Sequence, residues 1–185
     1  MNTSIIKRVV NHLVFSLFAI AVLVSCNNEP TLQTYFVDHQ ESANFISQDL
    51  PISMLNMDEA SLSETQAEAF NSVKRLNFIG FKVNDTNEAD MKAEMETVKT
   101  ILNNEKYNEL IEFSHLGNKF TVKYIGNDDE ADEVVVFANS KEIGFGVVRV
   151  LGDGMNPSKM GSLVGAMKYA NIDEEQLKGI ADFFK

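Results

Sequence analysis

The sequence predicts a single α+β domain with a mainly antiparallel sheet, a three-strand meander and amphipathic helices packed against it. Three strand-like runs lie close together, at 119–125, 133–138 and 143–151. The connections between them, GNDDEAD and NSKE, are short and rich in turn residues, as is usual in an antiparallel meander. The clearest helix is predicted at 88–103, where apolar residues recur every three or four positions as Met91, Met95, Val98 and Leu102.

The first three predicted elements lie between residues 32 and 74. Residues 32–41 form an amphipathic segment typical of a first helix. The segment 44–55 is extended, and Pro51 either breaks it or places it at the edge of a sheet. The residues SETQ at 63–66 fit a capping box, which predicts that a second helix begins there and runs to about Lys74.

The remaining elements are predicted from the pattern of apolar residues and from residues that favour helix starts. The run RLNFIGFKV at 75–83 is apolar on both sides, which predicts an inner strand. Lys106–Phe113 is interpreted as helical, either continuing the helix at 88–103 or restarting after it. Asn156 and Pro157 are a favourable start for a helix that runs to about Tyr169, and a last helix covers the C-terminus.

The first 25 residues are predicted to be a lipoprotein signal peptide. Lys7 and Arg8 give a positive start, the apolar run 13–24 follows, and the small residue Ser25 precedes Cys26. A membrane-spanning helix is the alternative, but the apolar run is shorter than the roughly 20 residues that a bilayer requires. The sequence Leu-Val-Ser-Cys resembles the bacterial lipobox, in which the cysteine thiol receives a glyceride and cleavage occurs just before it.

Lipidation of Cys26 has consequences for location and for domain organisation. One acyl chain binds a membrane marginally, whereas two or more anchor a protein stably. The residue after the cysteine is asparagine, which favours the outer membrane, and the periplasmic face is preferred over the cell surface. Residues 1–25 are thus a signal peptide, 26–31 a tether and 32–185 a single domain. Cys26 is the only cysteine, so no disulfide is expected.

Composition excludes one class of partner. Cleavage removes two cations and no acid, which lowers the net charge from −11 to −13. A body this acidic repels the phosphates of nucleic acids, so no nucleic-acid partner is expected. The expected partners are the membrane, through the lipid on Cys26, and an envelope protein.

The order of elements resembles a known family. A lipobox is followed by FISQDLPISML, a helix, a long Met-rich helix ending in KYNELIEF, a meander and a helical tail. This is similar to the bacterial envelope lipoproteins grouped as domain-of-unknown-function family 4252, over roughly 31–185. The resemblance implies an α+β envelope lipoprotein and no particular activity. The Gly- and Met-containing segment at 152–170 departs from the commonest pattern of the family.

No arrangement of residues points to catalysis. After cleavage the histidines are His39 and His115, and neither stands in a nucleophile motif such as G-x-S-x-G. No zinc motif such as H-E-x-x-H is present, and no cofactor is expected. We therefore expect a protein that is not an enzyme and has no metal site.

Two places keep a ligand-binding alternative open. The acidic run at 128–133 supplies oxygen ligands of the kind that calcium prefers, although a solvated loop is favoured. The corner from Gly152 to Lys159 joins a strand to a helix start, where backbone N–H groups can hold an anion. The favoured function is a lipid-anchored protein-interaction or accessory role, and the alternative is binding of a small ligand or ion.

Overall fold

In the computed structural model, residues 29–55, 62–167 and 178–184 are described, and Thr31–Lys185 is one compact unit. A six-stranded antiparallel sheet has the order β1-β2-β6-β5-β4-β3. Its strands are β1 (Phe45–Leu50), β2 (Val73–Lys82), β3 (Asn108–His115), β4 (Asn118–Gly126), β5 (Ala131–Ser140) and β6 (Gly144–Met155). The predicted α+β class with a mainly antiparallel sheet is confirmed.

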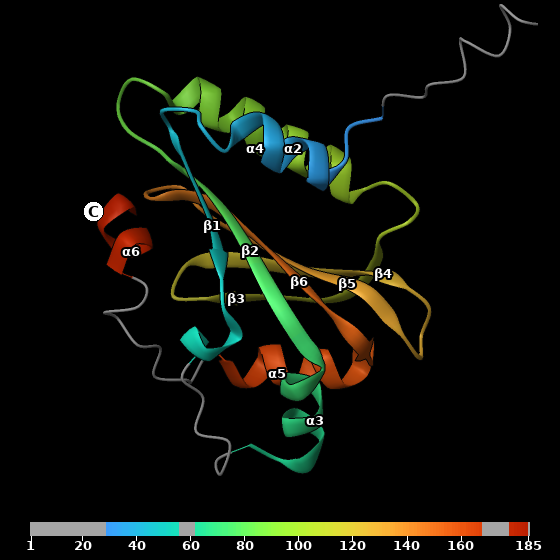
Figure 1. Ribbon diagram of the computed structural model, residues 1–185. Coiled ribbons are helices and arrows are strands. Elements are labelled where there is room, and N and C mark those ends of the chain that lie inside the picture. The colour runs from blue at the N-terminus through green and yellow to red at the C-terminus, as the bar shows by residue number, and fades with distance from the viewer. Residues whose placement is uncertain (1–28, 56–61, 168–177, 185) are drawn as a thin grey trace, which may run out of the picture. The chain divides into compact units, whose positions relative to one another are not determined.

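Helices lie on both sides of the sheet and make three layers (Figure 1). Helices α2 (Leu32–His39) and α4 (Glu88–Leu102) cover what we call the first face. Helices α3 (Glu64–Ser72), α5 (Pro157–Met167) and α6 (Lys178–Phe184) lie on the second face, and the short helix η1 (Ile52–Leu55) follows β1. Each face of the sheet therefore has its own apolar core.

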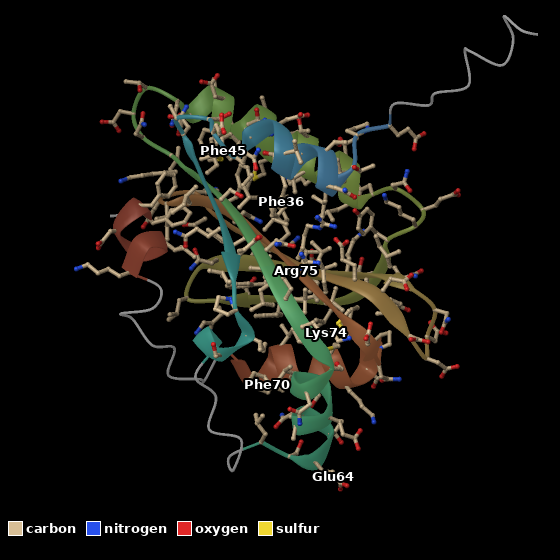
Figure 2. All side chains as sticks on the ribbon, viewed as in Figure 1. Phe36, Phe45, Glu64, Phe70, Lys74 and Arg75 are labelled. Carbon is tan, nitrogen blue, oxygen red and sulfur yellow. The ribbon has the colours of Figure 1, made fainter. Side chains whose placement is uncertain are left out.

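The core of the first face is aromatic where α2 meets the sheet. Phe36 of α2 and Phe45 at the start of β1 both lie between these helices and the strands (Figure 2). The ring of Phe45 meets that of Phe81 edge to face, with centroids 5.0 Å apart. Ring pairs of this geometry stabilise a core beyond the burial of their area. The inner strand predicted at 75–83 is confirmed as β2, which lies between β1 and β6.

Helix starts follow the signals in the sequence. The Ser63 hydroxyl accepts a hydrogen bond from the Gln66 N–H, and the Gln66 side chain accepts one from the Ser63 N–H, so the capping box at 63–66 is confirmed. Pro157 is the first residue of α5, as predicted. The predicted end of α5 near Tyr169 and the start of the last helix lie outside the described residues, as do Cys26 and the signal peptide.

The prediction of a helix at Lys106–Phe113 is wrong, because this segment forms β3 and pairs with β4. A register shift between Glu109 and Ile111 marks a β-bulge, which breaks the two-residue alternation of a strand. Tyr107, Leu110 and Ile111 are therefore spaced like one face of a helix. The meander consequently has four strands, β3 to β6, instead of three.

The glycines at 152–154 also differ from expectation, since β6 continues through them to Met155. A Cβ on Gly152 would lie 2.1 Å from the Ser72 carbonyl oxygen, so only glycine lets the end of α3 approach β6 this closely. The segment thus extends the sheet and delivers the chain directly to α5.

Candidate functional site

The two histidines outside the predicted signal peptide, His39 and His115, lie on different elements of the fold. His39 ends α2, where its Nδ1 lies 2.8 Å from the Tyr35 carbonyl oxygen and its Nε2 lies 3.4 Å from Glu94 Oε2. The Tyr35 hydroxyl donates to the same Glu94 oxygen at 2.9 Å. Burial, assisted by the Glu94 carboxylate, raises the pKa of Tyr35 well above its ordinary value. His39 is half-buried and joins α2 to α4, whereas His115 lies at the end of β3.

The loop that carries the acidic run at 128–133 is held by its own hydrogen bonds. Asn127 Oδ1 accepts hydrogen bonds from the N–H groups of Asp129 and Glu130, and the Tyr124 hydroxyl donates to Asp128 at 2.9 Å. Within the described residues, no group of three or more His, Cys, Asp or Glu side chains is placed to hold a metal. The loop is ordered by its own hydrogen bonds, as expected of the solvated alternative.

Glu133, the last acid of that run, points into the protein. It makes two hydrogen bonds with Arg149, from Nε at 2.9 Å and from Nη2 at 2.7 Å. The two side chains are only 9% and 14% exposed, and the guanidinium lies 5.6 Å from the centre of the Phe36 ring. The hydrogen bonds with Glu133 raise the pKa of Arg149 above its ordinary value. A pair so well satisfied and so buried is a structural element under α2.

Burial also changes the titration of Tyr107, which lies next to this ion pair. Desolvation and the Glu133 charge together raise the pKa of Tyr107 to about 12. Sequence reasoning missed this cluster, because residues 107, 133 and 149 meet only when β5 and β6 pair.

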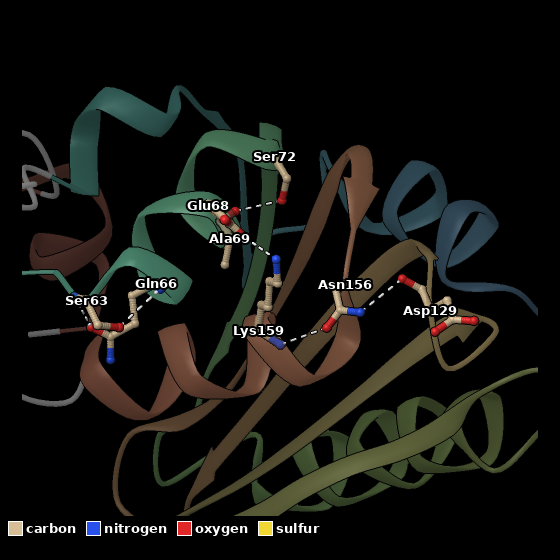
Figure 3. A network of polar contacts seen from close by, with 8 residues as sticks. All are labelled: Ser63, Gln66, Glu68, Ala69, Ser72, Asp129, Asn156 and Lys159. Atoms are coloured by element: carbon tan, nitrogen blue, oxygen red, sulfur yellow. Dashed lines mark hydrogen bonds and ion pairs between the residues drawn. The ribbon is translucent and has the colours of Figure 1, made fainter.

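The corner at Gly152–Lys159 is occupied by side chains of the chain itself (Figure 3). Asn156 Oδ1 accepts from the Lys159 N–H at 3.1 Å, and Asn156 Nδ2 donates to the Asp129 carbonyl at 3.1 Å. The Lys159 ammonium pairs with Glu68 of α3. Because the helix start is capped and its lysine is neutralised, this geometry gives no support to the anion-binding alternative.

Strands β3 and β4 are polar toward the first face. Thr121 and Lys119 both approach the Glu112 carboxylate, at 3.2 and 2.8 Å. Lys123 donates to the Leu102 carbonyl at the end of α4, at 2.8 Å. These groups border a polar groove of about 210 Å³. Several of its charged groups, among them Lys119, Glu112 and Lys123, are engaged by groups of the chain itself, which suits a surface in contact with water.

Toward the second face the same two strands are apolar. On this side Val122 and Tyr124 are buried, and the partly exposed apolar side chains are Leu110, Ile111, Phe113 and Phe120, which we call the apolar β3–β4 face. The rings of Phe113 and Phe120 stack with centroids 4.9 Å apart, and all four residues remain partly or largely exposed. Contiguous apolar surface that stays partly exposed is a feature shared by many interaction sites.

A pocket continues this face toward the ends of the β3–β4 and β5–β6 hairpins. We call it the hairpin-end pocket. It has a volume of about 250 Å³ and lies between α6 and the second face. Its main lining residues are Phe78, Phe120, Ala138, Ile143, Gly146 and Phe184, with Asn118, Asn139 and Ser140 at the polar side. Ile143 is 42% exposed, and Leu116 on the neighbouring hairpin is 86% exposed.

The fold defines a three-layer α+β domain built on one antiparallel sheet. The model of the family described as Domain of unknown function (DUF4252) matches residues 36–163, and the chain belongs to this family. The resemblance noted in the sequence is therefore confirmed. The match ends before α6, so the helix that borders the hairpin-end pocket lies beyond it.

Searches among curated proteins and among solved structures gave no significant match. No helix in the described ranges has the length and apolar character needed to cross a membrane.

Proposed function

We propose that this protein is a lipid-anchored component of the bacterial cell envelope that binds a protein partner through the apolar β3–β4 face, without a catalytic role. The observation that carries the proposal is the contrast between the two sides of β3 and β4. The polar side carries charged groups such as Lys119 and Glu112, which form an ion pair with each other. The apolar side keeps Phe113 and Phe120 partly exposed.

The turn between β3 and β4 adds independent support. Leu116 has a φ of 50° and is followed by Gly117 with a φ of 80°. Two-residue turns of this conformation favour Asn or Asp at the first position, because a leucine is strained there. The Leu116 side chain is 86% exposed, so it is available for a contact at this end of the β3–β4 hairpin.

The second part of the proposal is that a lipid on Cys26 holds the domain at the membrane surface. A lipid on Cys26 would hold the domain by a short tether, and the acidic domain would not lie flat on anionic lipid. The Cys26→Ala variant is expected to incorporate no palmitate, whereas the unaltered protein is labelled. Equal labelling of the two proteins, or no label on the unaltered protein, would exclude the lipid on Cys26.

The partner is tested with a photo-crosslinking amino acid at two adjacent positions of β4 in living cells. Phe120 points to the apolar side and Thr121 to the polar side, and both are partly exposed. We expect one dominant crosslinked protein from position 120, reduced by excess unmodified protein, and none from position 121. Equal crosslinking at both positions, or none at position 120, would contradict the proposal.

A further inference from the structure

Small residues stand side by side on the second face, near the hairpin between β5 and β6. The register pairs Gly80 of β2 with Gly146 of β6, and Gly146 with Ala138 of β5. This row forms a shallow trough, because two of its three members have no side chain and the third has one methyl group. Large side chains from above can therefore come directly onto the backbone of the sheet.

The rings of Phe78 and Phe184 pack over the Gly80 end of the trough. A Cβ on Gly80 would lie 2.7 Å from Cζ of Phe184 and 2.8 Å from Cζ of Phe78. A Cβ on Gly146 would lie 3.0 Å from Cε2 of Phe78. The rings of Phe78 and Phe184 meet edge to face with centroids 6.5 Å apart. Glycine is needed here because the rings occupy the space of a side chain.

The other end of the trough opens into the hairpin-end pocket. Gly146 and Ala138 border it, and Phe120 and Ile143 lie at its sides. Its volume of about 250 Å³ exceeds the roughly 150 Å³ of a cavity that holds benzene, and is below the roughly 300–1,000 Å³ of small-molecule sites. The size suits one bulky side chain better than a whole ligand.

The charges in and around the hairpin-end pocket limit which kind of side chain can enter it. No charged residue is among those described that line the pocket, and its polar groups are the neutral Asn118, Asn139 and Ser140. The group that enters it is therefore uncharged. The protein as a whole carries a net charge of −11, so basic residues next to the entering group are attracted over a longer range.

We propose that the hairpin-end pocket receives one aromatic side chain from a basic segment of the partner polypeptide, beside Phe184. The entering ring would meet Phe120 and Phe184 as Phe184 itself meets Phe78. This inference rests on the proposed function and names the chemistry of the partner. A single aromatic anchor in a pocket, surrounded by weaker contacts, is the usual arrangement of an interface hot spot.

The test uses the acylated full chain in nanodiscs and fluorine NMR of three probes. The first is acetyl-Arg-(para-fluorophenylalanine)-Arg-amide, the second has Glu in place of both Arg residues, and the third is a fluorinated octanol. We expect saturable binding of the Arg probe, at least roughly threefold tighter than the Glu probe at low salt, with the difference shrinking as salt rises.

A variant that fills the pocket separates this site from binding elsewhere. Ala138→Leu places a larger side chain in the pocket and should weaken the Arg probe by about tenfold or more. Ala89→Leu makes the same change at an exposed position of α4 and should leave binding unchanged. Circular dichroism of both variants verifies that they are folded.

Three results would overturn the inference: no binding of the Arg probe, equal binding by Ala138→Leu, or tighter binding of the octanol, which would indicate a site for an alkyl chain. The proposed function is judged separately, by crosslinking at position 120. Crosslinking at position 120 without binding of the Arg probe would reject only the proposal for the pocket. Absence of crosslinking at position 120 would reject the proposed protein partner.

Discussion

Replacing Arg149 with methionine should destabilise the protein strongly, because it leaves the Glu133 carboxylate buried without its partner. The two side chains are 14% and 9% exposed and share two hydrogen bonds of 2.9 and 2.7 Å. Breaking a buried pair by removing one member costs about 3–5 kcal/mol. Against a typical total stability of about 5–15 kcal/mol, that is a large fraction.

The assay is urea unfolding together with thermal unfolding, each followed by circular dichroism. At this chain length 1 kcal/mol shifts Tm by about 2–4 °C, so Tm should fall by about 6–20 °C. The matched control is Lys99→Met, which removes an exposed ion pair with Glu96 on α4. Exposed pairs contribute about 0–1 kcal/mol, so the control should behave nearly like the wild type.

A double variant separates loss of the pair from loss of packing. Changing Glu133 to Gln together with Arg149→Met removes the uncompensated charge and should recover part of the stability. The reasoning would be refuted if Arg149→Met lost less than about 1 kcal/mol, or if the double variant were no more stable than the single one.

Three further changes have defined outcomes. Gly80→Ala should displace the Phe184 ring and increase cleavage of the C-terminal helix in limited proteolysis, whereas unchanged cleavage would show that this contact does not hold α6. Because the pKa of Tyr107 is raised to about 12, the folded state keeps a proton that the unfolded state loses above about pH 10. The free energy of unfolding should therefore fall between about pH 10 and 12, and Tyr107→Phe should flatten this part of the profile; an unaltered slope would contradict it. Asn156→Ala removes the side-chain cap of α5 and should cost about 1 kcal/mol in urea unfolding, and a neutral result would mean that water replaces the cap.

Local signals predicted most of the secondary structure. The capping box at 63–66, the periodic apolar residues of α4 and the proline that begins α5 each act within a few residues, so they can be read directly. The exception was β3, where the bulge after Glu109 shifts the apolar positions into helical spacing. Pairing with β4 decides its structure, and that partner lies beyond any local window.

The candidate binding surface was harder to predict, because it depends on which strands are neighbours. Gly80, Ala138 and Gly146 are far apart in the sequence and form a trough only in the register of β2, β6 and β5. The segment at Lys106–Phe113 was interpreted as helical, so its pairing with β4 and the face that the two strands share were not predicted. In contrast, the partial burial of Phe184 against the second face follows from its place on the apolar side of the last helix.

The central claim is that a protein covers the apolar β3–β4 face in the cell envelope, and side-chain footprinting by hydroxyl radicals tests it most directly. Labelling of Ile111, Phe113 and Phe120 is compared between intact envelopes and the purified protein, with Val37 on α2, which is 59% exposed, as the internal reference. The account predicts that the three residues are protected in envelopes and become reactive on purification, while Val37 reacts equally in both. Equal labelling of all four in both samples would contradict it.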